Sequence, residues 1–112
     1  MNYLVVAYYI VMTSPRLSHS AALILRALHL GYRFGLEVMD VTGLPSGTVY
    51  PALRRLERDA LVESKWESDA EAANKQRPAR RYYEVTPAGK LAAHAAAERY
   101  PLLAHLTPER HA

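Results

Sequence analysis

The sequence lacks cysteine and contains no long hydrophobic segment. Because none of its 112 residues is Cys, disulfide bridges and thiolate metal sites are excluded. The longest apolar segment, residues 3–12, has about half of the roughly 20 residues that a bilayer-spanning helix needs, and no positively charged segment precedes it. We therefore expect no membrane-spanning helix and no secretion signal.

Charge of neither sign dominates, and apolar residues are frequent. Charged residues make up 22% and apolar residues 50% of the chain, which is enough apolar surface to offset the ordering entropy of one small domain. The net charge of +3 is compatible with a polyanionic partner, but many proteins without such a partner have a similar excess. Composition therefore indicates one folded domain, is compatible with a cytoplasmic protein, and leaves the function open.

The apolar segment at residues 3–12 has three interpretations. Met12 is followed by the polar sequence Thr-Ser-Pro-Arg, which is typical of a protein start, so one hypothesis is that translation begins at Met12 and not at Met1. Alternatively, residues 1–13 are an N-terminal extension, a short helix or strand that packs on a partner subunit. A third hypothesis, a peripheral membrane anchor, would be excluded if the protein failed to float with liposomes.

Three helices are expected in the first half of the chain. Ser18 or Ser20 can cap a helix whose apolar residues recur at helical spacing until Gly31, a typical C-terminal stop. A shorter helix is expected at residues 35–42, before a Gly-Leu-Pro turn. A third helix follows, with Ser46 as its expected N-cap. Its expected apolar stripe consists of Val49, Leu53, Leu56 and Ala60.

Two strands are expected next. Alternation at residues 62–67 predicts a strand with one buried face, Trp66 included, and a second strand is expected at residues 81–85. The intervening residues 68–79 lack large apolar side chains and predict an exposed hairpin loop. The acidic residues on its ascending side are Glu67, Asp69 and Glu71, and the basic residues on its descending side are Lys75, Arg77, Arg80 and Arg81.

A last helix completes the expected domain. Thr86 is its expected N-cap and Pro87 its first residue, and Pro101 interrupts it. Its expected stripe consists of Ala88, Leu91, Ala92, Ala95 and Ala96. This order of elements predicts a mainly α winged helix-turn-helix fold with a two-stranded β wing. The domain is expected at residues 14–100, followed by a tail at residues 101–112.

The polar face of the third helix predicts contact with double-stranded DNA. A helix fits the major groove, its N-terminal N–H groups favour phosphate, and Arg pairs with guanine edges or phosphate oxygens. The basic side of the hairpin loop can contact the adjacent backbone. The candidate DNA-binding residues are Ser46, Gly47, Thr48, Tyr50, Arg54, Arg55, Lys75, Arg77, Arg80 and Arg81. The alternative for the helix is a solvated face, on which Glu57 and Asp59 share charge with the arginines.

Three sequence motifs resemble those of the PadR-like transcriptional regulators. The sequence LPSGTVYPALRRLE at residues 44–57 resembles the recognition-helix signature of that family. The sequence LVES at residues 61–64 is similar to the start of the family's wing. The sequence RRYYEVTPAG at residues 80–89 is similar to its closing strand and the start of its last helix. The resemblance covers about residues 24–91.

This resemblance implies how the protein would act. Members of the family are mostly repressors, and the small ones form homodimers largely through the C-terminal helix, here from about residue 86. A two-fold dimer would place two recognition helices roughly 34 Å apart and predicts an inverted-repeat operator. Many members respond to small aromatic effectors, but no effector is identified here. The conceivable lining residues are Tyr8, Tyr9, Trp66 and Tyr100, but we expect Trp66 to belong to the core and the tyrosines near the chain ends to be disordered, and we predict no ligand site.

Other classes of function have weaker support in the sequence. The five histidines are scattered without a partner carboxylate, so no catalytic site and no cofactor are expected; they are His19, His29, His94, His105 and His111. Glu37 and Asp40 have the spacing of metal ligands on a helix, but we expect them to be ordinary exposed acids and predict no metal. The main alternative is a winged-helix protein-interaction module without DNA binding.

Overall fold

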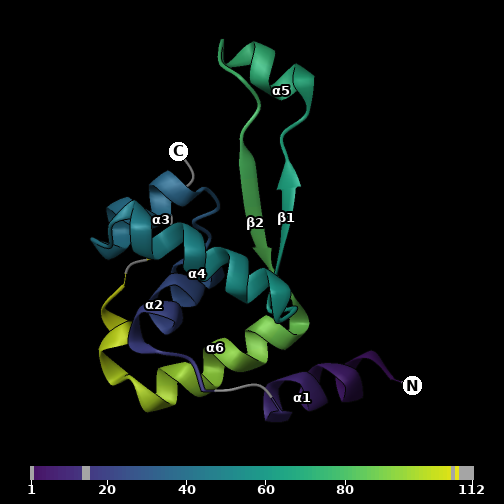
Figure 1. The fold of residues 1–112 in the computed structure, drawn as a ribbon, viewed down its shortest axis with the longest axis vertical. Coiled ribbons are helices and arrows are strands. Elements are labelled where there is room, and N and C mark those ends of the chain that lie inside the picture. Colours follow the sequence, from purple (N-terminus) through teal and green to yellow (C-terminus); the bar gives the residue numbers. More distant parts are fainter. Residues whose placement is uncertain (1, 14–15, 107, 109–112) are drawn as a thin grey trace.

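The computed structural model describes residues 2–13, 16–106 and 108. Its elements are the helices α1 (Tyr3–Thr13), α2 (His19–His29), α3 (Gly35–Thr42) and α4 (Ser46–Arg58), the strand β1 (Val62–Trp66), the short helix α5 (Asp69–Asn74), the strand β2 (Arg81–Val85), the helix α6 (Pro87–Arg99) and the 3₁₀ helix η1 (Pro101–His105). Figure 1 shows a helical body from which the two antiparallel strands project, with α5 at their tip and α1 beside α6. The predicted winged helix-turn-helix fold is confirmed.

The core lies between α2, α4 and α6. Ile24 and Leu25 from α2 are fully buried together with Leu53 and Leu56 from α4, as their helical spacing predicts. The prediction for Ala60 was wrong: α4 ends at Arg58, and Ala60 is exposed in a left-handed conformation with a φ of 62°. The next residue, Leu61, fills the core instead.

The N-cap of α2 agrees with the sequence prediction, whereas the N-cap of α4 does not. Ser18 is the N-cap of α2, and its hydroxyl accepts a hydrogen bond from the amide of Ala21 at 3.2 Å. In α4, however, Ser46 is the first helical residue and Pro45 is the N-cap. Among the described residues no side chain caps α4; the amide of Thr48 donates to the carbonyl of Pro45 at 3.0 Å, which leaves the amides of Ser46 and Gly47 available to another acceptor.

The buried face of α6 overlaps the predicted stripe but is rotated from it, because Ala88, Ala92 and Ala96 are buried as predicted and Leu91 and Ala95 are not. Its N-cap Thr86 accepts a hydrogen bond from the amide of Gly89 at 3.0 Å, as expected. Leu91 and Ala95 are exposed, and the buried residues are Ala88, Gly89, Ala92, Ala93 and Ala96. Gly89 explains this rotation, because a Cβ atom there would lie 1.9 Å from the carbonyl oxygen of Leu61.

The wing departs most from the sequence prediction. Residues 68–79 contain α5, whose N-cap Ser68 accepts a hydrogen bond from the amide of Glu71 at 3.1 Å. Trp66 is 66% exposed and Glu67 is buried, the reverse of what alternation predicted. The reason is that the strands extend beyond the helical body (Figure 1), so the face that buries Val62 has no core beneath it at Trp66.

The C-terminal segment also packs on the body. Residues 101–105, expected in the tail, form η1, and the side chain of Leu103 is buried beside Ala22 and Ala96. The hydroxyl of Tyr100 donates a hydrogen bond to the carbonyl of Leu17 at 3.0 Å. None of the helices in the described part of the chain has the length and apolar character needed to cross a membrane.

We expect Gly89→Ala to lower the free energy of unfolding by about 2–3 kcal/mol, because the new methyl group would force α6 away from Leu61. Chemical denaturation followed by circular dichroism measures this change. The control is Gly47→Ala, where an added Cβ meets nothing within 4 Å. This substitution should raise the free energy of unfolding by about 0.5–1 kcal/mol, because alanine favours the helix more than glycine does. Equal stability of the two variants would contradict the close approach of α6 to the backbone of Leu61.

Candidate nucleic-acid interface

The first two turns of α4 present the predicted helix residues to solvent. Val49 and Leu53 anchor the opposite face in the core. The residues with exposed side chains or backbone are Ser46, Gly47, Tyr50, Arg54 and Arg55, and Thr48 is partly buried. Within the described part of the chain, no carboxylate pairs with Arg54 or Arg55, so both cations are available to an anionic partner. The prediction that Arg58 shares charge with Asp59 is confirmed by a distance of 3.3 Å.

A hollow of about 400 Å³ lies between α4 and the descending side of the wing. Its lining residues are Phe34, Gly35, Leu36, Tyr50, Arg54, Arg80, Arg81 and Tyr83. Four of the ten residues predicted to bind DNA therefore meet here, two from α4 and two from the descending side of the wing. The lining contains three guanidinium groups and no carboxylate, which is a donor-rich surface suited to acceptor oxygens.

Four lining residues were not predicted as part of the site: Phe34, Gly35, Leu36 and Tyr83. An added Cβ at Gly35 would lie 2.5 Å from the Cε1 atom of Tyr50, so the absence of a side chain at Gly35 allows the tyrosine ring to pack there. The guanidinium carbon of Arg80 lies 3.8 Å from the ring centroid of Phe34, a cation–π contact. No sequence pattern indicated these contacts, because they join segments that are distant in the chain.

A polar junction connects α4 to the strands. The Nη2 atom of Arg81 donates hydrogen bonds to Oε2 of Glu57 at 3.1 Å and to Oγ of Ser64 at 2.6 Å. Ser64 in turn donates to Glu57. We call these three residues the helix–wing junction. The alternative interpretation of α4, in which Glu57 shares charge with the arginines of its own helix, does not describe this residue, because its carboxylate pairs with Arg81 of the wing.

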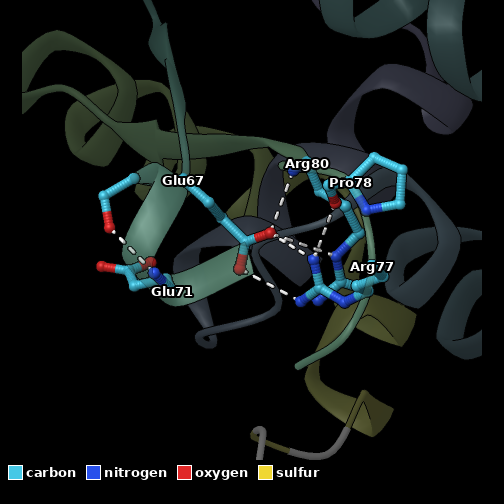
Figure 2. A network of polar contacts seen from close by, with 6 residues as sticks. Glu67, Glu71, Arg77, Pro78 and Arg80 are labelled. Carbon is cyan, nitrogen blue, oxygen red and sulfur yellow. Dashed lines mark hydrogen bonds and ion pairs between the residues drawn. The ribbon is translucent and has the colours of Figure 1, made fainter. Parts of the chain in front are cut away.

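A second network holds the wing tip, and Figure 2 shows it from close by. Glu67 lies at its centre, and its side chain is only 3% exposed. Its carboxylate accepts hydrogen bonds from Nη1 and Nη2 of Arg77 and, at 3.0 Å, from the amide of Arg80. The Nε atom of Arg80 lies 3.6 Å from the same carboxylate. We call Glu67, Arg77 and Arg80 the wing-tip cluster.

These contacts determine the charge of the wing. The hydrogen bonds from Arg77, opposed by desolvation and supported by the hydrogen bond from the amide of Arg80, together lower the pKa of Glu67 to about 2. Glu67 is therefore ionised at neutral pH and balances charge on both arginines of the wing-tip cluster. The basic side of the wing is thus less positive than the sequence indicated. Lys75, at the C-terminal end of α5, is exposed and has no carboxylate partner among the described residues.

Candidate residues for other functions do not form sites. Glu37 caps α3, because its Oε1 atom accepts hydrogen bonds from the amides of Arg33 and Phe34 at 3.0 and 3.1 Å. The described residues contain no group of three acidic or histidine side chains that could hold a metal ion. Trp66 is on the wing, at the opposite end of the molecule from α1 (Figure 1), so within one chain it does not meet Tyr8 and Tyr9.

The comparisons with known proteins agree with this architecture. The model of the transcriptional regulator PadR-like family matches residues 24–95, which is more than half of the chain. The solved structure of a PadR-like transcription factor from Bacteroides fragilis is similar in fold, with a TM-score of 0.60 and 23% sequence identity over 76% of this chain and 82% of that chain. None of the curated protein sequences compared with it is significantly similar. The chain therefore belongs to the PadR-like family of transcriptional regulators.

Proposed function

We propose that this protein is a cytoplasmic transcriptional regulator that binds a specific DNA operator and acts as a repressor, without catalytic activity. One observation carries the proposal: α4 and the descending side of the wing share one hollow whose lining, among the described residues, includes three arginines and two tyrosines and no carboxylate. A DNA backbone is rich in acceptor oxygens and carries negative charge, so it matches this surface.

In this proposal the N-terminal half of α4 lies in the major groove. The hydroxyl groups of Ser46, Thr48 and Tyr50, together with the amide of Gly47, contact phosphates near the uncapped helix end. Arg54 or Arg55 reads base edges, because both side chains are exposed and unpaired in the free protein.

The wing would contribute its cations in two ways. Lys75 offers an unpaired charge to the DNA backbone from the wing tip. Arg80 and Arg81 line the hollow and can share a phosphate while they keep their carboxylate partners. Arg77 was predicted as a direct contact, but its bidentate pair with Glu67 favours a structural role.

We further propose a homodimer that includes α1 and α6. Helix α1 is apolar on every side, and such a helix requires burial. It packs along α6 of its own chain, yet many of its side chains are still exposed: Tyr3, Leu4, Val5, Val6, Tyr8 and Tyr9. A second copy would cover this surface and would present two recognition helices to an inverted repeat.

One observation favours the alternative of a protein-interaction module. Two carboxylates, those of Glu67 and Glu57, face Arg77, Arg80 and Arg81, so part of the positive charge of the wing is already balanced. The exposed Trp66 on β1 would suit a protein partner. The same DNA-binding experiment separates the two functions.

We expect the double variant Arg54→Ala/Arg55→Ala to lose sequence-selective DNA binding, with affinity reduced at least roughly tenfold because each lost base contact is worth about 1–3 kcal/mol. A gel-shift titration against the DNA upstream of the protein's own gene and a scrambled control, at two salt concentrations, measures this. The control variant Arg16→Ala/Arg99→Ala removes the same charge outside α4 and the wing. Absence of binding by folded wild-type protein at low salt would favour the interaction module.

We expect Leu4→Asp to weaken the homodimer at least roughly tenfold, because burial of a leucine is worth about 1.5–3 kcal/mol in each subunit. Sedimentation equilibrium over a range of protein concentrations measures the dissociation constant. Leu36→Asp is the control, since Leu36 is 63% exposed and Leu4 is 66% exposed, but Leu36 lies on α3. An unchanged association of the Leu4→Asp variant would exclude α1 from the interface.

A further inference from the structure

The wing-tip cluster places a buried acid at the base of a short helix. Glu67 follows β1 directly, and its amide donates a hydrogen bond to the carbonyl of Arg80 at 2.9 Å, which closes the ladder between the strands. Beyond this pair the chain leaves the sheet and forms α5. The side chain of Glu67 turns inward, whereas the residues on either side of it, Trp66 and Ser68, are exposed.

Helix α5 has little else to hold it in place. It contains six residues, far fewer than an isolated helix needs for stability, and Ala72 is its one buried residue. After α5 the chain turns through Gln76, which has a φ of 54°, and reaches Arg77. The amide of Arg77 bonds back to the carbonyl of Ala72 at 3.2 Å, and its guanidinium bonds to Glu67. The Glu67–Arg77 pair therefore joins the end of the tip to its beginning.

Both carboxylate oxygens of Glu67 are occupied. Oε1 accepts from Arg77 and from the amide of Arg80, and Oε2 accepts from the second terminal nitrogen of Arg77 at 3.1 Å (Figure 2). Arg77 also donates to the carbonyl of Pro78 at 3.3 Å. A bidentate pair of this kind fixes the direction of both side chains, and a buried carboxylate needs every one of these donors.

We propose that Glu67 is a positioning residue for DNA binding, which orients the wing tip so that Lys75 and the hollow beside α4 can contact one DNA backbone at the same time. The inference rests on the proposed function. It assigns a favourable role in DNA binding to an acidic residue, although a negative charge near DNA is unfavourable by itself.

The charge of Glu67 and its positioning role predict opposite effects on DNA binding. If charge alone mattered, Glu67→Gln would strengthen DNA binding, since it removes a negative charge and releases two arginines. If Glu67 acts by position, the same variant weakens binding, because an amide nitrogen cannot accept a hydrogen bond from Arg77. Glu71→Gln is the matched control: it removes one negative charge from the same wing, but Glu71 is exposed and its hydrogen bonds in the described residues come from its backbone, whose amide donates to Ser68 and whose carbonyl accepts from the amide of Lys75.

The experiment compares both variants with the full-length wild-type protein by gel shift and by amide hydrogen exchange. For Glu67→Gln we expect roughly tenfold weaker DNA binding, the size of one lost hydrogen bond to a charged group, and faster exchange at residues 68–79. For Glu71→Gln we expect equal or slightly tighter binding and unchanged exchange. Arg77→Lys, which keeps the net charge but cannot form the bidentate pair, should behave as Glu67→Gln does.

The outcomes distinguish this inference from the proposed function. A wild-type protein that binds no DNA would refute the proposed function, and the positioning role with it. Wild-type binding together with equal or tighter binding by Glu67→Gln would refute only the role of Glu67, whether or not exchange at residues 68–79 increases. Weaker binding by both Glu67→Gln and Arg77→Lys, with faster exchange in this segment, would support it.

Discussion

The hydrogen bonds between Glu57, Ser64 and Arg81 connect the two parts of this molecule that face a partner. Glu57 belongs to α4, and Ser64 and Arg81 belong to the strands, so this junction sets the angle at which the wing leaves the helical body. The hollow lined by Tyr50, Arg54, Arg80 and Arg81 exists only at that angle. Close packing at Gly89 holds the body beneath the junction, because α6 touches the backbone at Leu61.

Charge is distributed unevenly over the proposed interface. In the described part of the chain, Arg54 and Arg55 of α4 pair with no carboxylate, whereas the arginines of the wing are held by Glu57 and Glu67. Paired arginines are fixed in direction, and unpaired ones can adapt to base edges. We therefore expect α4 to recognise the base sequence. We expect the wing to supply a surface of fixed shape, with Lys75 at its tip as a cation that has no carboxylate partner among the described residues. Fixing the wing in advance lowers the entropic cost of binding.

The sequence predicted the elements that depend on local signals. Ser18 and Thr86 cap helices as expected, and α3 and β2 have their predicted bounds. It did not predict properties that depend on distant contacts. Alternation placed Trp66 inside, but the core ends below the wing. Charge counting placed four cations on the wing, but the buried Glu67 and the partly exposed Glu57 pair with three of them. Helix α5 was missed because its six residues have no apolar stripe, only a cap at Ser68.

The central claim is that two copies of α4, each with its wing, contact successive turns of one DNA face. Hydroxyl-radical footprinting of the wild-type protein on the DNA upstream of its own gene tests it most directly. The account predicts two protected segments related by an inverted repeat and separated by about one helical turn, roughly 34 Å. Folded protein that protects no segment at low salt, or protects a single segment without a symmetric counterpart, would contradict it.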